Sequence, residues 1–309
     1  MRVVWLWAVL AGLLTVLTGP SAVEDDLGRR ARTLIGEHPE IWSGARTFRG
    51  DLSLVVAAPG ALTAPGALTA SGTTVPQAAR TSATGPVPGG GAAAVASGAA
   101  FADLARRADR ASRLVARVVG PVRPLIAVPA TTEQAAVLAA PAQVSGLAAV
   151  AGADRVIVEP RSFARLTAAG RDVVLAHEIT HIATGAALDG STPKWLVEGF
   201  ADYVGYLDAG IPARRAAAEL ADEVRAGRTP ERLPGPEAFA AGSARQAQAY
   251  EEAWLACRYV AGRFGERALV SLYRESRHGD VRAALSRTLR MSLERFTAAW
   301  REYVRDQLA

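Results

Sequence analysis

Two patterns of apolar residues divide this chain into an earlier and a later half. In the earlier half, short apolar runs rich in β-branched residues predict strands at residues 48–56, 124–128, 144–150 and 155–159. Apolar residues at helical spacing predict a long helix at 101–119 and short helices at 24–38 and 132–138. This half therefore predicts a small mixed sheet backed mainly by one helix.

The later half of the chain repeats its apolar residues almost entirely at helical spacing. The pattern predicts helices at residues 193–207, 212–226, 244–264, 266–274, 280–289 and 292–308. Strands followed by a run of helices are typical of the α+β class. We therefore predict an α+β fold in which a small mixed β-sheet with helices is followed by a mainly α-helical C-terminal subdomain, with a cleft between them.

The composition changes sharply before the long helix. Residues 57–100 consist mostly of Ala, Gly, Pro, Thr and Ser, and they contain the near-repeat Ala-Pro-Gly-Ala-Leu-Thr twice. Such a stretch has too little apolar bulk to offset the entropy of ordering it, which favours a mobile linker or insert. The predicted organisation is an N-terminal region at 23–56, this linker or insert at 57–100, and one folded domain at 101–309.

The first residues have the layout of an export signal. One basic residue, Arg2, precedes about fifteen apolar residues, and the chain turns acidic at Glu24. The apolar stretch is shorter than the ~20 residues that a spanning helix prefers, but Pro20 stands where a cleavage site prefers a small residue. Residues 1–22 are therefore interpreted as a signal peptide or an N-terminal anchor, with membrane attachment through residues 3–18. Both interpretations predict a secreted or extracytoplasmic protein.

Charge and cysteine content exclude some classes of function. The 309 residues carry a formal net charge of +5, and the basic residues are arginines except for Lys194. The arginines alternate with acids along predicted helices, and no basic motif is interleaved with aromatic residues, which argues against a nucleic-acid partner. The single cysteine, Cys257, cannot form an internal disulfide, and its apolar surroundings predict a buried small side chain. The oligomeric state stays open.

The segment His177-Glu178-Ile179-Thr180-His181 carries the main chemical signal. On a helix, His177 and His181 project from one face, one turn apart, so that a single cation can sit between them. Glu178 points along nearly the same side, where it can hold a water on that cation. The alternative is a solvated amphipathic helix with a polar pair. The apolar residues before the motif and at Ile179 favour the first interpretation, because they are typical of a core helix whose histidines face a cleft.

A second acidic helix follows, with Thr192 as the predicted N-cap and Pro193 as the first helical residue. Glu198 and Asp202 lie four residues apart and share a face of this helix. Glu198 is then the third metal ligand, and Asp202 accepts the outer N–H of a ligating histidine, with His177 preferred. Three protein ligands and one open position are typical of a catalytic zinc site rather than a closed structural one.

These two segments resemble a known family. Their spacing and the run PKWLVEGFADYV look like the gluzincin zinc metallopeptidases, most of all a small bacterial branch of the MA-type superfamily. The resemblance covers roughly residues 100–309 and implies a zinc metallopeptidase domain at 101–309. It implies Zn2+ held by His177, His181 and Glu198, with Glu178 as the general base. Asp202 would not bind the metal but would form a hydrogen bond to one of its ligands. The long-spaced histidine of metzincins is absent.

The resemblance also implies a hydrogen-bond donor to the oxyanion besides the metal. Gluzincins usually supply a tyrosine or histidine from a later helix, and Tyr250 is the candidate here. Packing of the Tyr250 ring beside Trp254 is the alternative interpretation. Such enzymes commonly bind substrate along an exposed sheet edge, and we expect residues 155–159 to form that edge.

The expected function is an exported zinc-dependent metallopeptidase that uses a zinc-activated water and a glutamate general base. The acidic motif with which aminopeptidases of this group grip a free α-amine is not visible at residues 146–151, which favours an endopeptidase acting on a peptide or protein substrate. Two alternatives stay open. One is a catalytically idle zinc-containing binding or scaffold module of the cell envelope, and the other is a hydrolase of a non-protein amide or a cell-wall crosslink.

Overall fold

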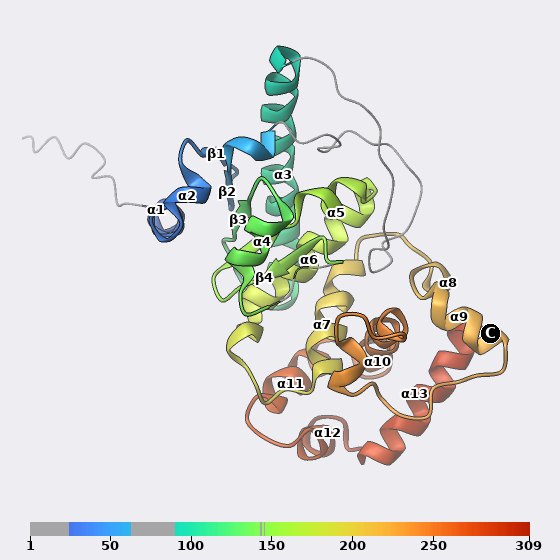
Figure 1. Ribbon diagram of the computed structural model, residues 1–309. Helices are drawn as coiled ribbons and strands as arrows, with labels where there is room; N and C mark the ends of the chain where they lie inside the picture. The colour runs from blue at the N-terminus through green and yellow to red at the C-terminus, as the bar shows by residue number, and fades with distance from the viewer. Residues whose placement is uncertain (1–24, 63–89, 143, 145) are drawn as a thin grey trace, which may run out of the picture.

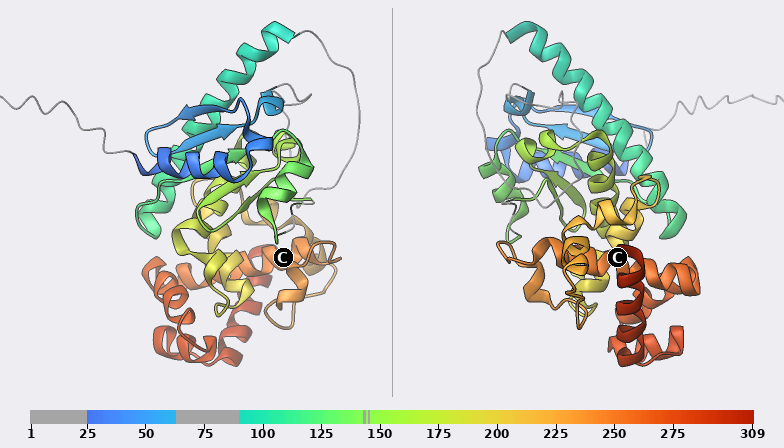
Figure 2. Two further views of the ribbon diagram at one scale, coloured as in Figure 1. Left: turned by 60° about the vertical axis from the view of Figure 1, so that its left-hand side comes forward. Right: turned by 90° about the vertical axis from the view of Figure 1, so that its right-hand side faces the viewer.

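The computed structural model describes residues 25–62, 90–142, 144 and 146–309. It has the predicted α+β fold, in which a five-stranded mixed sheet with helices is followed by a mostly helical C-terminal region (Figure 1). The sheet and the later helices occupy opposite ends of the molecule (Figure 2). Two helices, α6 (Ala168–Thr184) and α7 (Lys194–Tyr206), lie between these ends and pack against each other.

The five strands lie in the order β1-β2-β3-β5-β4. Their bounds are Arg46–Arg49 for β1, Leu54–Ala57 for β2, Leu125–Val128 for β3, Ala149–Ala151 for β4 and Arg155–Val158 for β5. The strands β2, β3 and β5 are parallel, whereas β1 and β4 are antiparallel to their neighbours. β4 is therefore the terminal strand on the side of β5.

Helices cover both faces of the parallel strands, so these strands are buried on both sides. The helices of this part are α1 (Asp26–Glu37), α2 (Pro39–Trp42), α3 (Gly90–Val118), α4 (Thr132–Ala139) and α5 (Pro160–Arg165). Alternate strand residues join two different cores, as the period of a strand requires. Val55 and Val156 pack into the main core with α3 and α6. Val56 and Ile157 pack into a smaller core with α1 and α4.

The C-terminal region is built around α10, which packs along α7. Its helices are α8 (Ala213–Ala216), α9 (Ala218–Arg225), α10 (Gln246–Phe264), α11 (Glu266–Ser276), α12 (Val281–Leu289) and α13 (Leu293–Leu308). Cys257 on α10 is fully buried, as its apolar surroundings predict. Trp300 of α13 is also fully buried in this core, so the last helix closes the far side of the helical region.

Two predicted elements are each divided into two in the structure. The strand predicted at 48–56 is a hairpin of β1 and β2, because the carboxylate of Asp109 on α3 accepts the backbone N–H groups of Asp51 and Leu52 at 2.7 and 3.0 Å. The helix predicted at 212–226 is interrupted at Ala217, whose φ and ψ of −118° and 55° are not helical.

Other predicted boundaries also differ. The strand predicted at 144–150 is reduced to β4, and α3 starts at Gly90 rather than at residue 101. β2 ends at Ala57 and a 3-10 turn follows at Pro59–Leu62, so regular structure reaches into both ends of the predicted linker. Residues 63–89 and the predicted signal or anchor at 1–22 lie outside the described residues. No helix of the described segments is both long and apolar enough to cross a membrane.

Candidate metal centre

The first wall of the site is α6, a helix with a marked start and stop. The hydroxyl of Thr167 accepts the backbone N–H of Gly170 at the N-terminus, and Gly185 ends the helix in the left-handed conformation with φ 68°. The apolar face of α6 is buried in the main core, with Leu175 and Ile179 fully buried. The opposite face of α6 carries the two motif histidines, as the apolar pattern predicts.

The second wall is α7, which begins differently from the prediction. Thr192 does not cap α7, because its hydroxyl donates to the carboxylate of Asp189 at 2.6 Å and Pro193 stands at the cap position. Burial by itself raises the pKa of the Asp189 carboxyl, but the hydrogen bonds that it accepts from Thr192 and Ser191 outweigh burial and lower the pKa to about 2. The side chain of Thr192 therefore organises the loop before α7 and not the helix itself.

Two glycines of α7 allow its neighbours to approach closely. A Cβ on Gly199 would overlap the backbone carbonyl of Ala253 on α10. A Cβ on Gly205 would lie 3.0 Å from the carbonyl oxygen of Val173 on α6. The backbone of α7 is thus held against α6 on one side and α10 on the other, which fixes the direction of the acidic side chains that α7 carries.

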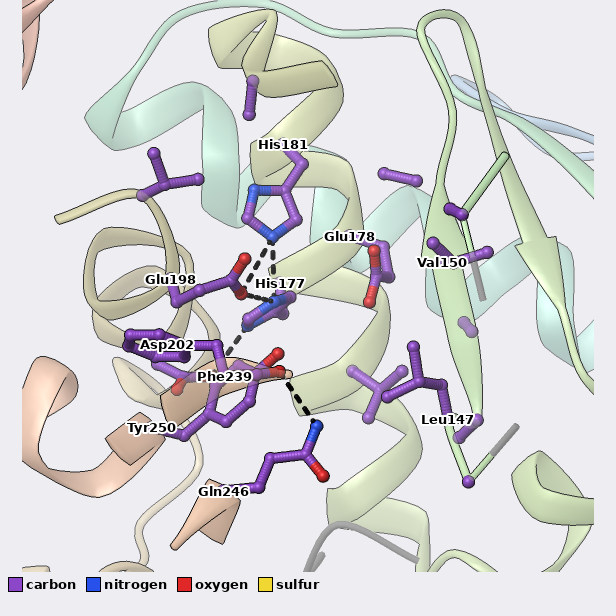
Figure 3. A pocket seen from close by; sticks show the side chains of 18 of the residues that line it. Leu147, Val150, His177, Glu178, His181, Glu198, Asp202, Phe239, Gln246 and Tyr250 are labelled. Atoms are coloured by element: carbon purple, nitrogen blue, oxygen red, sulfur yellow. Dashed lines mark hydrogen bonds and ion pairs between the residues drawn. The ribbon is translucent and has the colours of Figure 1, made fainter. Parts of the chain in front are cut away.

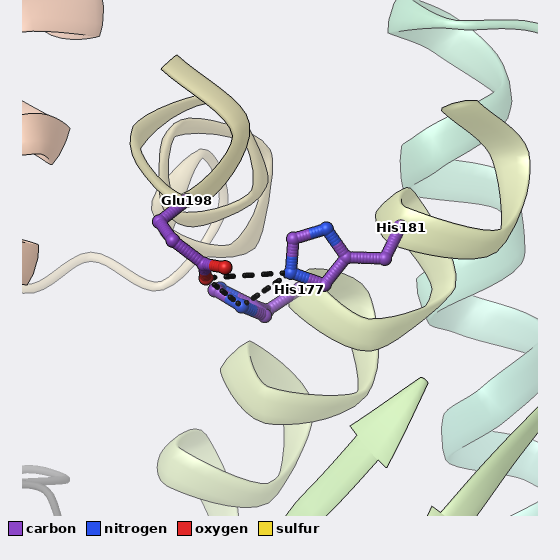
Figure 4. Close-up of side chains that lie close together, drawn as sticks. All are labelled: His177, His181 and Glu198. Carbon is purple, nitrogen blue, oxygen red and sulfur yellow. Dashed lines mark hydrogen bonds and ion pairs between the residues drawn. The ribbon is translucent and has the colours of Figure 1, made fainter. Parts of the chain in front are cut away.

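The side chains of His177, His181 and Glu198 converge at the point where α6 faces α7 (Figure 4). The Nε2 atoms of the two histidines lie 2.9 Å apart, and Oε2 of Glu198 lies 3.3 and 3.4 Å from them. Donors about 2.0–2.1 Å from a tetrahedral zinc are roughly 3.3 Å from one another. The three donors therefore fit a zinc ion in type, number and spacing.

A hydrogen bond between the helices orients the first of these histidines. The Nδ1 atom of His177 lies 2.7 Å from Oδ1 of Asp202. When Nδ1–H donates to this carboxylate, the Nε2 atom carries its lone pair toward His181 and Glu198. The structure therefore brings Asp202 to the predicted position, against the predicted histidine.

The buried charges of the site act strongly on one another. Burial by itself lowers the pKa of His177, but Asp202 and Glu198 outweigh it and raise the pKa well above its usual value. Burial raises the pKa of Glu198, but His181 and His177 outweigh it and hold the pKa well below its usual value. The three largely buried carboxylates of Glu178, Glu198 and Asp202 surround the two imidazoles. A divalent cation would offset their negative charge.

Glu178 lies beside the donor cluster and not within it (Figure 3). Burial raises the pKa of its carboxyl, although His177 and His181 oppose the shift. The backbone N–H of Ala151 in β4 donates to the same carboxyl. Glu178 is therefore a partly desolvated carboxyl with raised basicity, held between α6 and the edge of the sheet.

The donor cluster and Glu178 line a cavity of about 970 Å³. One wall of this cavity is formed by residues 146–153, which include β4, and another by the start of α10. The prediction that residues 155–159 form the sheet edge is wrong, because β5 pairs with β3 on one side and β4 on the other. Glu159 does not continue the strand, since its side chain caps α5. β4 is the edge that faces the cavity.

The orientation of β4 follows from two backbone hydrogen bonds. Gly152 donates to the carbonyl of Arg155, and Glu159 donates to the carbonyl of Ala148. Since backbone groups alternate in direction along an antiparallel strand, those of Ala149 and Ala151 point away from β5. The apolar pattern predicted a strand at 144–150, but it could not show that this strand, rather than residues 155–159, forms the edge of the sheet.

Tyr250 of α10 also reaches the cavity (Figure 3). Its ring lies 6.4 Å from the ring of His177 and packs edge-on against Phe239 at 5.2 Å. The ring that packs beside Trp254 belongs to Tyr206, at 4.9 Å. Burial raises the pKa of Tyr250 well above its usual value, and the nearby Glu198 adds to this shift. Its phenol group therefore stays protonated at neutral pH.

Several residues of the cavity wall escaped the sequence analysis. Phe239 and Gln246 line the cavity and are joined through a hydrogen bond from the Gln246 side-chain amide to the Phe239 carbonyl, at 3.2 Å. Lys194 also lines the cavity and contacts Glu198. Phe239 and Gln246 belong to no recognisable motif and reach the site only through the packing of separate segments, whereas Lys194 lies in the run that carries the family resemblance, four residues before Glu198.

No protein-family model, curated protein or solved structure matches this chain. The donor set, its spacing and its surroundings are therefore the basis for a functional hypothesis.

Proposed function

We propose that this protein is a zinc-dependent metallopeptidase of the gluzincin type. The observation that carries the proposal is the convergence of His177, His181 and Glu198 at spacings that suit tetrahedral zinc, with Glu178 beside them in a cavity. Three protein donors leave one coordination position for the reaction. The export signal expected at residues 1–22 would place this activity outside the cytoplasm.

Each side chain has a definite task in this proposal. Bound zinc would supply Lewis-acid chemistry, lowering the pKa of a water and polarising the substrate carbonyl. Glu178 takes a proton from the attacking water and returns it to the leaving amine. The raised pKa of Glu178 suits this task, because a more basic carboxylate accepts the proton more readily. Asp202 holds His177 in the tautomer that presents Nε2.

The cavity walls supply positions for the substrate. The backbone groups of Ala149 and the carbonyl of Ala151 point away from β5, so an extended peptide could add to β4 by strand pairing, while the N–H of Ala151 bonds to Glu178. The protonated phenol of Tyr250 would donate a hydrogen bond to the oxyanion that develops at the scissile carbonyl. The large open cavity has room for residues on both sides of the cleaved bond, which favours an endopeptidase.

The proposal is tested with the purified protein and a diverse peptide library read by mass spectrometry. We expect the parent to cut peptides internally, and Glu178→Gln to retain zinc but lose cleavage. Metal analysis should show one zinc in the parent and none in His181→Ala, whereas His278→Ala, altered at an exposed turn, should keep it. Residual cleavage by Glu178→Gln would contradict the general-base role, and full zinc occupancy in His181→Ala would contradict the ligand set.

A further inference from the structure

Lys194 forms an ion pair with the third donor of the metal centre. Its Nζ atom lies 2.6 Å from Oε1 of Glu198, one helical turn away on α7. The two histidines lie near the other carboxylate oxygen, Oε2, at 3.3 and 3.4 Å. The two oxygens of Glu198 are thus divided, because one faces the ammonium group and the other faces the imidazoles.

The ion pair is not explained by the stability of α7. Lys194 is the first residue of this helix, where the positive end of the helix dipole disfavours a cation. The order Lys before Glu is also the weaker arrangement of an i,i+4 pair. The side chain of Lys194 is 45 % exposed, whereas that of Glu198 is 5 % exposed. The ammonium therefore reaches from the surface to a buried carboxylate at some cost to the local helix.

The residue type is equally specific. The chain has 35 basic residues, and Lys194 is its only lysine. A guanidinium offers a planar fork that matches both oxygens of a carboxylate, whereas an ammonium is a compact point charge that can bind one of them. Lysine at this position can neutralise Oε1 and leave Oε2 free for a metal.

We propose that Lys194 is a positioning residue that holds Glu198 as a ligand through a single oxygen, Oε2. This inference rests on the proposed metal centre. A glutamate that binds the metal through both oxygens would add a fifth donor atom and crowd the position that the reaction needs. By occupying Oε1, Lys194 keeps the number of protein donor atoms at three and leaves the fourth coordination position open.

The test uses the full chain loaded with Co2+ in place of zinc, because the visible spectrum of Co2+ reports its coordination number. We expect the parent to give the strong absorption of a four-coordinate ion. Lys194→Met should give the weaker absorption of a five-coordinate ion, and X-ray absorption should detect one additional oxygen neighbour. Lys194→Gln is measured in the same way, so that the inference does not depend on one variant folding.

Arg282→Met is the matched control, because it removes an exposed ion pair with Glu294, and neither residue lines the cavity. Its Co2+ spectrum should equal that of the parent. Equal spectra in the parent and in both Lys194 variants would overturn the inference. Absence of Co2+ binding by the parent would overturn the metal centre and the inference together. The Co2+ spectra test the role of Lys194, whereas peptidase activity tests only the proposed function. A failure of one proposal can therefore be distinguished from a failure of the other.

Discussion

The Nδ1 atom of His177 and a carboxylate oxygen of Asp202 lie 2.7 Å apart, across the interface of α6 and α7. This contact joins a residue of the first motif to a residue of the second. It also directs the other ring nitrogen of His177 toward His181 and Glu198, from which it lies 2.9 and 3.3 Å away. The donor set is therefore preorganised by the packing of two helices.

Replacement of Asp202 by asparagine should weaken zinc binding. An amide oxygen is a poorer acceptor for the Nδ1–H group of His177 than a carboxylate, so the imidazole becomes a weaker donor to the metal. We expect a loss of about 10–100-fold in zinc affinity, measured by competition with a chelator. Asp208→Asn, at an exposed position after α7, should retain the parent affinity. Equal affinities in the two variants would contradict the role given to Asp202.

Replacement of Tyr250 by phenylalanine should slow hydrolysis without affecting the metal. The ring remains to pack against Phe239, but the proposed donor to the oxyanion is lost. We expect kcat to fall by about 10²–10³-fold, while metal analysis shows an unchanged zinc content. Tyr259→Phe on the same helix is the control, since Tyr259 packs against Phe296 and does not line the cavity. An unchanged kcat in Tyr250→Phe would leave Tyr250 with a packing role only.

Replacement of Gly199 by alanine should destabilise the protein. The new Cβ would overlap the carbonyl of Ala253 and force α7 and α10 apart, at a cost of about 1–3 kcal/mol. Gly262 lies at an exposed position in the last turn of α10 with open space at its Cβ position, so Gly262→Ala should stabilise by up to about 1 kcal/mol through helix propensity. Denaturant unfolding measures both, and effects of the same sign would contradict this account.

Replacement of Glu251 by glutamine should change how stability depends on pH. Burial and the neighbouring Glu219 raise the pKa of Glu251 to about 10, and its carboxyl accepts the backbone N–H of Leu220 at 2.7 Å. An acid with a raised pKa binds its proton more tightly in the folded state, so the parent loses stability as pH rises from the ordinary carboxyl pKa toward about 10. Glutamine cannot ionise and still offers an acceptor oxygen.

The measurement is the Tm of Glu251→Gln minus the Tm of the parent. This difference should become more positive between about pH 6 and about pH 9, because only the parent loses stability over this range. Glu302→Gln, at an exposed position of α13, serves as the control and should show a constant difference. A difference for Glu251→Gln that also stays constant with pH would argue against the raised pKa.

The sequence by itself determined the features of this protein that depend on neighbouring residues, namely which side chains share a helix face and where most helices and buried strands lie. The helical spacing of His177 and His181, and of Glu198 and Asp202, is a property of the backbone, so each pair shares a face wherever its helix lies. Apolar periodicity likewise indicated most of the helices, the buried strands and the α+β class. These features depend on neighbours within one or two turns, which a single sequence records.

Only the tertiary structure decided how these segments meet. The order β3-β5-β4 makes β4 the edge of the sheet, and the apolar pattern that predicted a strand in this segment did not show its place in the order. The contacts of Gly199 with α10 and of Glu198 with the two histidines of α6 depend on the positions of whole helices. Packing between distant segments is cooperative, because it minimises voids and unpaired charges over the entire core, and no local pattern specifies that result.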